Sequence, residues 1–202
     1  MNRKIPVVLD LQEIEALKKA PNQRYKSALR DKAIIYLVLN TGLRADEVIN
    51  LKLKNIDLKN KTITLDHAKK DSFGNVVFNS DDVVRLIKEW LKIRPKNSEW
   101  LFCTVTKDKK LFKNGRSTTP GNKLSRQYLT NMVKRYSRIA NIDKTISFHT
   151  LRHSYATWLY VKTHNIEKVR QQLRHASIET TIIYTRTAWQ FEGHEALNGF
   201  QL

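Results

Sequence analysis

The segment His-Thr-Leu-Arg-His at residues 149–153 brings two groups that act on phosphate within one helical turn. Residues three apart in a helix share a face, so the side chains of His149 and Arg152 are expected to point the same way. This pairs an imidazole that transfers protons with a guanidinium that binds phosphate through a fork of N–H donors. The segment also opens a predicted helix, whose free backbone N–H groups favour an anion. A surface His–Arg pair is the ordinary alternative.

Three further residues lie at the joints between predicted helices. Arg44 follows the helix stop at Gly42, and this turn can aim its guanidinium inward, although an exposed pair with Glu47 is the ordinary alternative. His175 lies between two predicted helices, and Tyr184 follows nine residues later. A tyrosine hydroxyl has a pKa of about 10, so it acts as a nucleophile only beside a base or in a positive field. The commoner role of such a tyrosine is a buried hydroxyl with a satisfied hydrogen bond.

The balance of charges indicates a polyanionic partner. The 202 residues include 37 Lys and Arg against 19 Asp and Glu, for a formal net charge of +18. A charge of this size opposes compaction unless a polyanion neutralises it, so nucleic acid is the expected partner. An anionic membrane is the competing interpretation, but no basic amphipathic helix stands apart from the predicted fold to bind one.

The segment 104–123 is basic and contains a single acid, Asp108. A solvated loop is the ordinary interpretation. A loop that contacts phosphates is favoured, because nearly all of its charge has one sign. The basic residues of this segment are Lys107, Lys109, Lys110, Lys113, Arg116 and Lys123.

The sequence offers no pattern of metal ligands and no motif that binds a cofactor. Its single cysteine, Cys103, allows neither a disulfide nor a thiolate metal site. We therefore expect phosphate chemistry without a metal or cofactor, in which Arg and Lys supply the charge that stabilises the transition state. No apolar run is long enough to span a bilayer, and the first residues lack the apolar core of a signal peptide, so the sequence predicts a soluble cytosolic protein.

Hydrophobic periodicity predicts that most of the chain is helical. Asp10 with Glu13 forms a capping box before the first helix, and Ser80 caps another that ends before Pro95. Further helices are expected at about residues 25–41, 125–140, 149–163, 166–173, 177–185 and 187–197. Another helix is expected to begin beside residue 44.

A small sheet is predicted in the middle of the chain. Residues 62–65 alternate like a strand, residues 71–75 have the composition of a turn, and residues 76–78 form a short returning strand. Residues 100–102 are expected to be a third strand. The sequence thus predicts a mainly α, α+β fold with a three-stranded antiparallel sheet, in one domain covering residues 1–202.

Taken together, these residues resemble the tyrosine recombinase (phage integrase) family from about Val7 to about Thr187. The resemblance rests on Thr-Gly-Leu-Arg at 41–44, His-x-x-Arg at 149–152, a second histidine at 175 and Thr-Thr-x-x-Tyr at 180–184. It implies the fold of that family's catalytic domain. It also implies site-specific DNA recombination (integration, excision or inversion) through a 3′-phosphotyrosine, without metal or ATP.

The resemblance assigns a role to each matching residue. Arg44 and Arg152 would clamp the non-bridging oxygens of the scissile phosphate. His149 would transfer a proton beside Arg152, and His175 would hydrogen-bond the phosphate. Tyr184 would be the nucleophile.

The family lysine lies in a turn between two strands and would protonate the leaving 5′ oxygen. Lys69 matches this position, and Lys70 is a one-residue alternative. Glu47 matches an acidic position that supports the first arginine. His153, one step from Arg152, is expected to turn to a different face of its helix and is interpreted as a structural or surface group.

The chain departs from the family pattern in two places. Arg174 stands where the family commonly has a glycine before its second histidine, so it either contacts DNA or marks a joint that is built differently. Arg44 also comes too early to leave room for the DNA-clamp domain that most members carry. The chain is therefore expected to be either an excised catalytic domain or a naturally short protein, as the fimbrial invertases are.

The resemblance further implies partners. Double-stranded DNA would be bound by self-association into a tetrameric synapse, from a chain that can be a monomer in solution, at the bacterial nucleoid. The tail 187–202 is expected to dock on a neighbouring subunit, whereas packing on its own domain is the ordinary alternative.

Three other functions compete with recombination. A type IB topoisomerase-like enzyme would use the same covalent chemistry to relax DNA. A DNA-binding protein of the same fold would no longer cut, which an inert Tyr184 would establish. A metal-dependent nuclease fits the sequence least, and loss of activity in EDTA would favour it.

Overall fold

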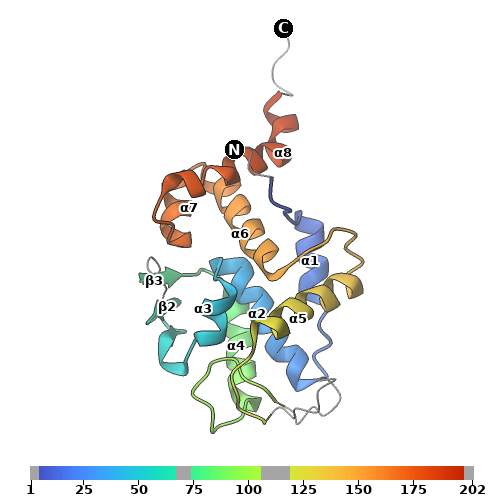
Figure 1. Cartoon of the computed structure of the whole chain (residues 1–202), viewed down its shortest axis with the longest axis vertical. Coiled ribbons are helices and arrows are strands. Elements are labelled where there is room, and N and C mark those ends of the chain that lie inside the picture. The colour runs from blue at the N-terminus through green and yellow to red at the C-terminus, as the bar shows by residue number, and fades with distance from the viewer. Residues whose placement is uncertain (1–4, 67–73, 106–118, 198–202) are drawn as a thin grey trace.

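The computed structural model describes residues 5–66, 74–105 and 119–197 (Figure 1). Within these ranges the fold is mostly helical with a small sheet, as the periodicity predicted. The α-helices are α1 (Leu11–Lys19), α2 (Lys26–Thr41), α3 (Ala45–Asn50), α4 (Asp81–Ile93), α5 (Arg126–Ile139), α6 (Phe148–Thr163), α7 (Ile166–Leu173) and α8 (Ile183–Leu197). Single 3-10 turns occur at Leu53–Asn55 and Ile178–Thr180.

Local sequence signals set where several helices begin. The Asp10 carboxylate accepts the Glu13 backbone N–H at 2.8 Å, and the Glu13 carboxylate accepts the Asp10 N–H at 2.8 Å, so the predicted capping box is confirmed. The Ser80 hydroxyl accepts the backbone N–H of Val83, which places the start of α4 where the cap predicted it. These side chains bond N–H groups that a helix leaves without partners at its first turn.

Gly42 ends α2 and turns the chain toward α3. Its φ of +65° lies in the left-handed region, where a residue with a Cβ is strained. A Cβ at this position would lie 2.6 Å from Cδ1 of Tyr155 and 2.7 Å from Cδ2 of Leu173. The glycine therefore lets α6 and α7 approach the turn that carries Arg44.

The sheet has the strand order β1-β2-β3, formed by β1 (Ile56–Asp57), β2 (Thr62–Leu65) and β3 (Gly74–Val77), all antiparallel. The expected strand at 100–102 is wrong: this segment makes only an isolated bridge between Trp100 and Lys52. Leu101 and Phe102 are both completely buried. Two consecutive buried side chains break the alternation of a strand that has one face toward solvent, which explains the difference.

The core forms where α2 packs against α4 and α6 (Figure 1). Leu37 of α2, Trp90 of α4 and Leu151 of α6 are completely buried in this cluster. The indole N–H of Trp90 donates to the Leu101 carbonyl at 2.7 Å, which holds the segment after α4 against the same core. Because Leu151 packs α6 against this core, the position of the adjacent residue, Arg152, is fixed.

The two helices expected at 177–185 and 187–197 are in fact one 3-10 turn followed by the continuous helix α8. Tyr184 lies in the first turn of α8, so the helix that carries it also carries the tail. Phe191 of α8 packs on Trp158 of α6, with ring centroids 4.9 Å apart. Because no Gly or Pro separates the two predicted segments, the helix has no reason to break between them.

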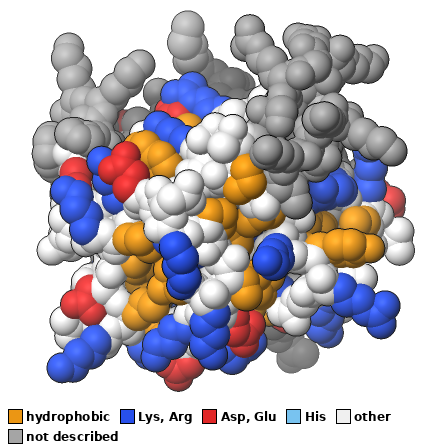
Figure 2. All heavy atoms as spheres, turned by 90° about the horizontal axis from the view of Figure 1, so that it is seen from below, with side chains coloured by type: hydrophobic (Ala, Val, Ile, Leu, Met, Phe, Trp, Pro, Cys, Tyr) orange, Lys and Arg blue, Asp and Glu red, His pale blue; other side chains and the backbone are white. Residues whose placement is uncertain are grey.

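No described helix is both long and apolar enough to cross a membrane. Figure 2 shows the molecule from below, the end away from α7 and α8, with Lys and Arg side chains spread among hydrophobic ones. Basic side chains therefore also cover a face away from the joints at which the chemistry-bearing residues lie.

Candidate active site

Arg44 is the residue that precedes α3, and Glu47 holds it there. The Glu47 carboxylate accepts the backbone N–H of Arg44 at 2.7 Å and its guanidinium at 3.0 Å. The Glu47 side chain is 5% exposed, whereas that of Arg44 is 34% exposed. A buried carboxylate thus orients a guanidinium that still reaches solvent, which is the geometry expected of a supported phosphate ligand.

Arg174 bonds the same carboxylate, at the oxygen that also accepts the backbone N–H of Arg44. Its guanidinium donates to Oε2 of Glu47 at 2.7 Å, and both side chains are 5% exposed. In the free chain Arg174 therefore forms a buried ion pair with Glu47. The backbone explains why glycine is common at this position. Arg174 caps the end of α7 with a φ of +54°, a left-handed conformation in which glycine is favoured. The ion pair with Glu47 offsets that strain.

Arg174→Ala and Arg174→Gly separate the contribution of the ion pair with Glu47 from that of the backbone strain at residue 174. Both variants lose the ion pair, but only glycine relieves the strain of the left-handed backbone. This strain contributes about 1 kcal/mol to the difference in unfolding free energy between them. We expect the alanine variant to lose about 2–3 kcal/mol of unfolding free energy, since Glu47 keeps Arg44 as its partner. The glycine variant should lose about 1 kcal/mol less. Urea unfolding measures both values, and equal stability of the two variants would show that the backbone at 174 is unstrained.

Arg152 is the most deeply buried cation of the site, with 1% of its surface exposed. Its guanidinium donates to the carbonyls of Gly42 and Leu173, the latter at 2.8 Å, and to Nε2 of His175 at 3.1 Å. It therefore joins the turn after α2 to the end of α7. Burial, and then the charge of Arg44, lower the pKa of Arg152 to about 10, so the guanidinium remains charged at neutral pH.

His175 has a defined tautomer. Because a guanidinium only donates, Nε2 accepts from Arg152, and Nδ1 therefore carries the proton and donates to the Thr181 hydroxyl at 2.9 Å. Burial, followed by the charges of Arg152 and Arg44, lowers the pKa of His175 to about 3, so the ring is neutral at pH 7.

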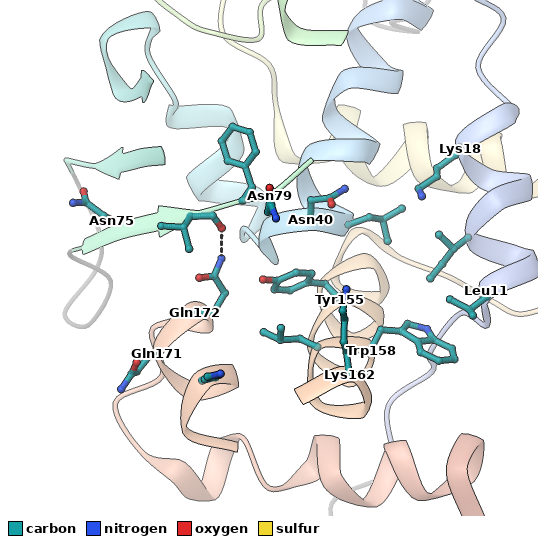
Figure 3. Close-up of a pocket in the computed structure, with 16 residues that line it drawn as sticks. Leu11, Lys18, Asn40, Asn75, Asn79, Tyr155, Trp158, Lys162, Gln171 and Gln172 are labelled. Carbon is teal, nitrogen blue, oxygen red and sulfur yellow. Dashed lines mark hydrogen bonds between the residues drawn. The ribbon is translucent and has the colours of Figure 1, made fainter. Parts of the chain in front are cut away.

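The end of α7 is tied to the sheet on its other side. The Gln172 side chain donates to the carbonyl of Val77 in β3 at 2.6 Å (Figure 3). This contact lies at a cavity of about 740 Å³ between α1, β3, α6 and α7, whose lining also includes Tyr155 and Trp158. Neither Arg152, His175 nor Tyr184 lines this cavity, so the cavity and the polar cluster are different places.

The Tyr184 hydroxyl lies inside the polar cluster, and the residue is 2% exposed. Its oxygen is 3.1 Å from Nδ1 of His153, and its ring stacks at 15° on that of His175, with centroids 6.3 Å apart. Burial raises the pKa of Tyr184, while the charges of Arg152 and Arg44 and a hydrogen bond from Arg152 act to lower it. The hydroxyl is therefore protonated at neutral pH but lies in a positive field.

His149 and His153 lie one helical turn apart at the start of α6. Their rings meet edge to face with centroids 4.5 Å apart. Desolvation by neighbouring groups, and then the charges of Arg152 and Arg44, lower the pKa of His149, although part of its side chain reaches solvent. Burial, then His149 and Arg152, lower the pKa of His153 to about 4.

The expectation that His153 faces away from the site is thus wrong. It shares a helix face with His149, because residues four apart on a helix are neighbours, and this spacing was the signal that the sequence contained. Although His153 is turned from Arg152 by one step along the helix, its side chain still reaches the hydroxyl of Tyr184 on α8.

Several predicted site residues are not joined to this cluster by the structure. Lys123 is described, but it bonds Asn50 and lies over the ring of Trp100, 4.9 Å from its centroid. The predicted residues Lys69, Lys70, Lys107, Lys109, Lys110, Lys113 and Arg116 lie outside the described residues.

The cluster has the composition of a site for a tetrahedral oxyanion. Arg44 and Arg152 supply fixed positive charge, and three imidazoles and a phenol surround them. The charge of Arg44 acts on the pKa of His149, His175 and Tyr184 alike, which places these groups within one electrostatic neighbourhood. Among the described residues, no three His, Cys, Asp or Glu side chains gather as metal ligands would.

Comparisons with known proteins identify relatives of this chain. The chain is 34% identical over 191 residues to the tyrosine recombinase XerD of Staphylococcus saprophyticus, covering 93% of this chain and 60% of that protein. It is 34% identical over 188 residues to the XerD of Staphylococcus aureus, with the same coverage of 93% and 60%. The chain therefore spans less than two thirds of the length of these relatives.

Solved structures support the same relationship. The XerA recombinase superposes with a TM-score of 0.76 at 26% identity, over 96% of this chain and 66% of that one. The XerH recombinase, in a post-cleavage complex with its palindromic difH substrate, superposes with a TM-score of 0.76 at 29% identity, over 96% and 53%. The model of the phage integrase family matches residues 7–190. The resemblance seen in the motifs is confirmed, and this chain belongs to the phage integrase family.

Proposed function

We propose that this chain is the catalytic part of a site-specific DNA recombinase that cleaves and rejoins strands through a 3′-phosphotyrosine at Tyr184. One observation carries the proposal: the Tyr184 hydroxyl is buried among Arg152 and two imidazoles, in the field of Arg44. The relatives named tyrosine recombinases support it.

The two arginines hold the scissile phosphate. Arg44 and Arg152 bind its non-bridging oxygens and stabilise the negative charge that grows in the pentacoordinate transition state. The bonds of Arg152 to two carbonyls fix its guanidinium before DNA binds, so little reorganisation accompanies the reaction. His175 hydrogen-bonds the phosphate when DNA is bound, after its ring exchanges the bonds to Arg152 and Thr181 that it makes in the free chain. His149 transfers a proton beside Arg152.

Cleavage forms one bond and breaks another. The Tyr184 oxygen bonds to phosphorus, and the bond from phosphorus to the 5′ oxygen breaks. Lys69, or Lys70 as the alternative, protonates that oxygen, because lysine readily shifts its pKa in a crowded cationic site. The protein–DNA link keeps the free energy of the phosphodiester, so the 5′-hydroxyl of another strand can reverse the step.

Double-stranded DNA is the partner, and the enzyme acts at the bacterial nucleoid. The segment with Lys107, Lys109, Lys110, Lys113 and Arg116 follows the backbone of the DNA, with Lys123 at its end. The high net positive charge supports this binding.

Recombination requires several copies on DNA, and α8 joins them in a tetrameric synapse. Phe191 packs on Trp158 of its own chain, whereas Trp189 is 60% exposed. An exposed tryptophan two residues before an internally packed phenylalanine supports contact with a neighbouring subunit.

Trp189→Ala tests this assembly. The thermal unfolding temperature should stay unchanged, since the indole is mostly solvated, while the affinity of the assembly on DNA with two sites falls about tenfold or more. Sedimentation measures the assembly, and Gln190→Ala, another exposed position on the same helix, is the matched control. Assembly at the wild-type affinity in the Trp189 variant would contradict the role of this surface.

Covalent trapping tests the function itself. The protein is incubated in EDTA with a pool of nicked duplexes, in which the cut strand loses the short fragment that carries the leaving 5′-hydroxyl. A protein–DNA adduct that survives a denaturing gel is the expected result, and its transfer to a second duplex distinguishes recombination from relaxation. Bound DNA without any adduct would contradict the proposal.

A further inference from the structure

We propose that His153 is a further catalytic residue, which accepts the proton of the Tyr184 hydroxyl as that oxygen attacks phosphorus. The proposal rests on the proposed function of Tyr184 as the nucleophile. It begins from the 3.1 Å contact between Nδ1 of His153 and the phenolic oxygen, in which we assign the hydroxyl as the donor.

The neighbours of Tyr184 leave His153 as its proton acceptor among the described residues. Arg152 lowers the pKa of the phenol through its charge, but a guanidinium has no acceptor and stays charged. His175 stacks on the tyrosine ring, and its two nitrogens already bond Arg152 and Thr181. His153 instead presents a ring nitrogen to the hydroxyl, with ring centroids 5.6 Å apart at 49°.

Two groups set the direction of the proton. The positive charge of Arg152 acts on the phenolic oxygen and repels its O–H, so the O–H turns toward Nδ1 of His153, 3.1 Å away. The ring of His153 is steadied by the edge-to-face contact with His149 one turn earlier on α6. The acceptor is therefore positioned by α6 and the donor by α8, and the packing of these two helices sets their distance.

The electrostatic surroundings make His153 neutral before DNA binds. His149 and Arg152 face it from α6, and Tyr184 faces it from α8; burial with the first two lowers its pKa to about 4. An acceptor must be unprotonated, so this state is competent. A phosphate bound by Arg152 brings negative charge beside the ring, which raises the proton affinity of the imidazole when the phenol loses its proton.

The step balances without another reactant. The bond between the Tyr184 oxygen and phosphorus forms, the bond from phosphorus to the 5′ oxygen breaks, and the phenolic proton moves to Nδ1 of His153. The leaving oxygen takes its proton from the lysine at 69 or 70. In rejoining, a 5′-hydroxyl attacks phosphorus and gives its proton back to the neutral lysine. The bond from phosphorus to the Tyr184 oxygen breaks, and His153 returns its proton to the departing phenolate.

The rate of covalent adduct formation on the nicked duplex tests the proposal. We expect His153→Ala to react about 100-fold or more slowly than wild type at pH 7, the usual contribution of a positioned base. His153→Asn keeps an oxygen near the place of Nδ1 but cannot take a proton, so it should also stay slow. In both variants the rate should rise as pH increases toward 10, because solvent then removes the phenolic proton. His164→Asn, on the exposed end of the same helix, is the control.

A duplex with sulfur in place of the bridging 5′ oxygen distinguishes removal of the Tyr184 proton from protonation of the leaving group. A thiolate leaves without an acid, so this substrate should not restore His153→Ala, whereas it should restore Lys69→Ala or Lys70→Ala. Restoration of His153→Ala, or a wild-type rate in His153→Asn, would overturn the proposal. Absence of any adduct with the wild-type protein would instead overturn the assignment of Tyr184 as nucleophile, so the two failures are distinct.

Discussion

Tyr184→Phe should abolish the covalent adduct while leaving DNA binding intact. The substitution removes only the phenolic oxygen, and loss of a nucleophile lowers the rate by a factor on the order of 10⁵ or more. The ring, which stacks on His175, is kept. The lost hydrogen bond to His153 should cost about 1 kcal/mol of unfolding free energy. A denaturing gel measures the adduct, and a gel-shift assay measures binding.

Tyr160→Phe is the matched control, because Tyr160 lies on α6 near His164 rather than in the polar cluster. It should form the adduct at the wild-type rate. An adduct in Tyr184→Phe would mean that another residue attacks the phosphate, and peptide mapping of the DNA-linked fragment would then identify it.

Arg152→Lys should nearly eliminate cleavage although it keeps a positive charge. The guanidinium donates at once to the carbonyls of Gly42 and Leu173 and to His175, and an ammonium on a flexible stem cannot reach all of them. We expect the rate of adduct formation to fall by about 10²–10³-fold, as when one donor to a transition-state oxyanion is removed. The unfolding free energy should fall by about 2–4 kcal/mol, since buried carbonyls lose a charged partner.

Arg126→Lys provides the comparison for this variant. Arg126 also bonds a protein group, the Asp46 carboxylate, but it is exposed, and its replacement should change the stability by less than about 1 kcal/mol. Adduct formation is followed on the gel and stability by urea unfolding. A normal cleavage rate in Arg152→Lys would show that charge alone, and not the fork of donors, serves the phosphate.

The joint before His175 shows how a departure from the family pattern is accommodated. Where a glycine would adopt the left-handed conformation without strain, Arg174 adopts it and gains a buried bond to Glu47. Glu47 in turn orients Arg44. The residue that departs from the family pattern therefore connects α7 to the first arginine of the site.

The sequence by itself determined the features that depend on neighbouring residues. The capping box at Asp10, the helix stop at Gly42 and the alternation of strand β2 are local, because each needs contacts within only a few residues. The spacing of His149 and Arg152 on one helix is local as well. Membership of the family was also readable, since its motifs are short and consecutive.

Only the tertiary structure decided which residues meet across elements. The partner of His153 lies 31 positions away on α8, and that of Arg174 lies 127 positions away in α3. No periodicity along the chain encodes such pairs, because they depend on how α6, α7 and α8 pack around Gly42. The same packing buried Leu101 and Phe102 together and excluded the third strand expected there. Helical spacing indicates which face a residue shares, but packing determines what that face contacts.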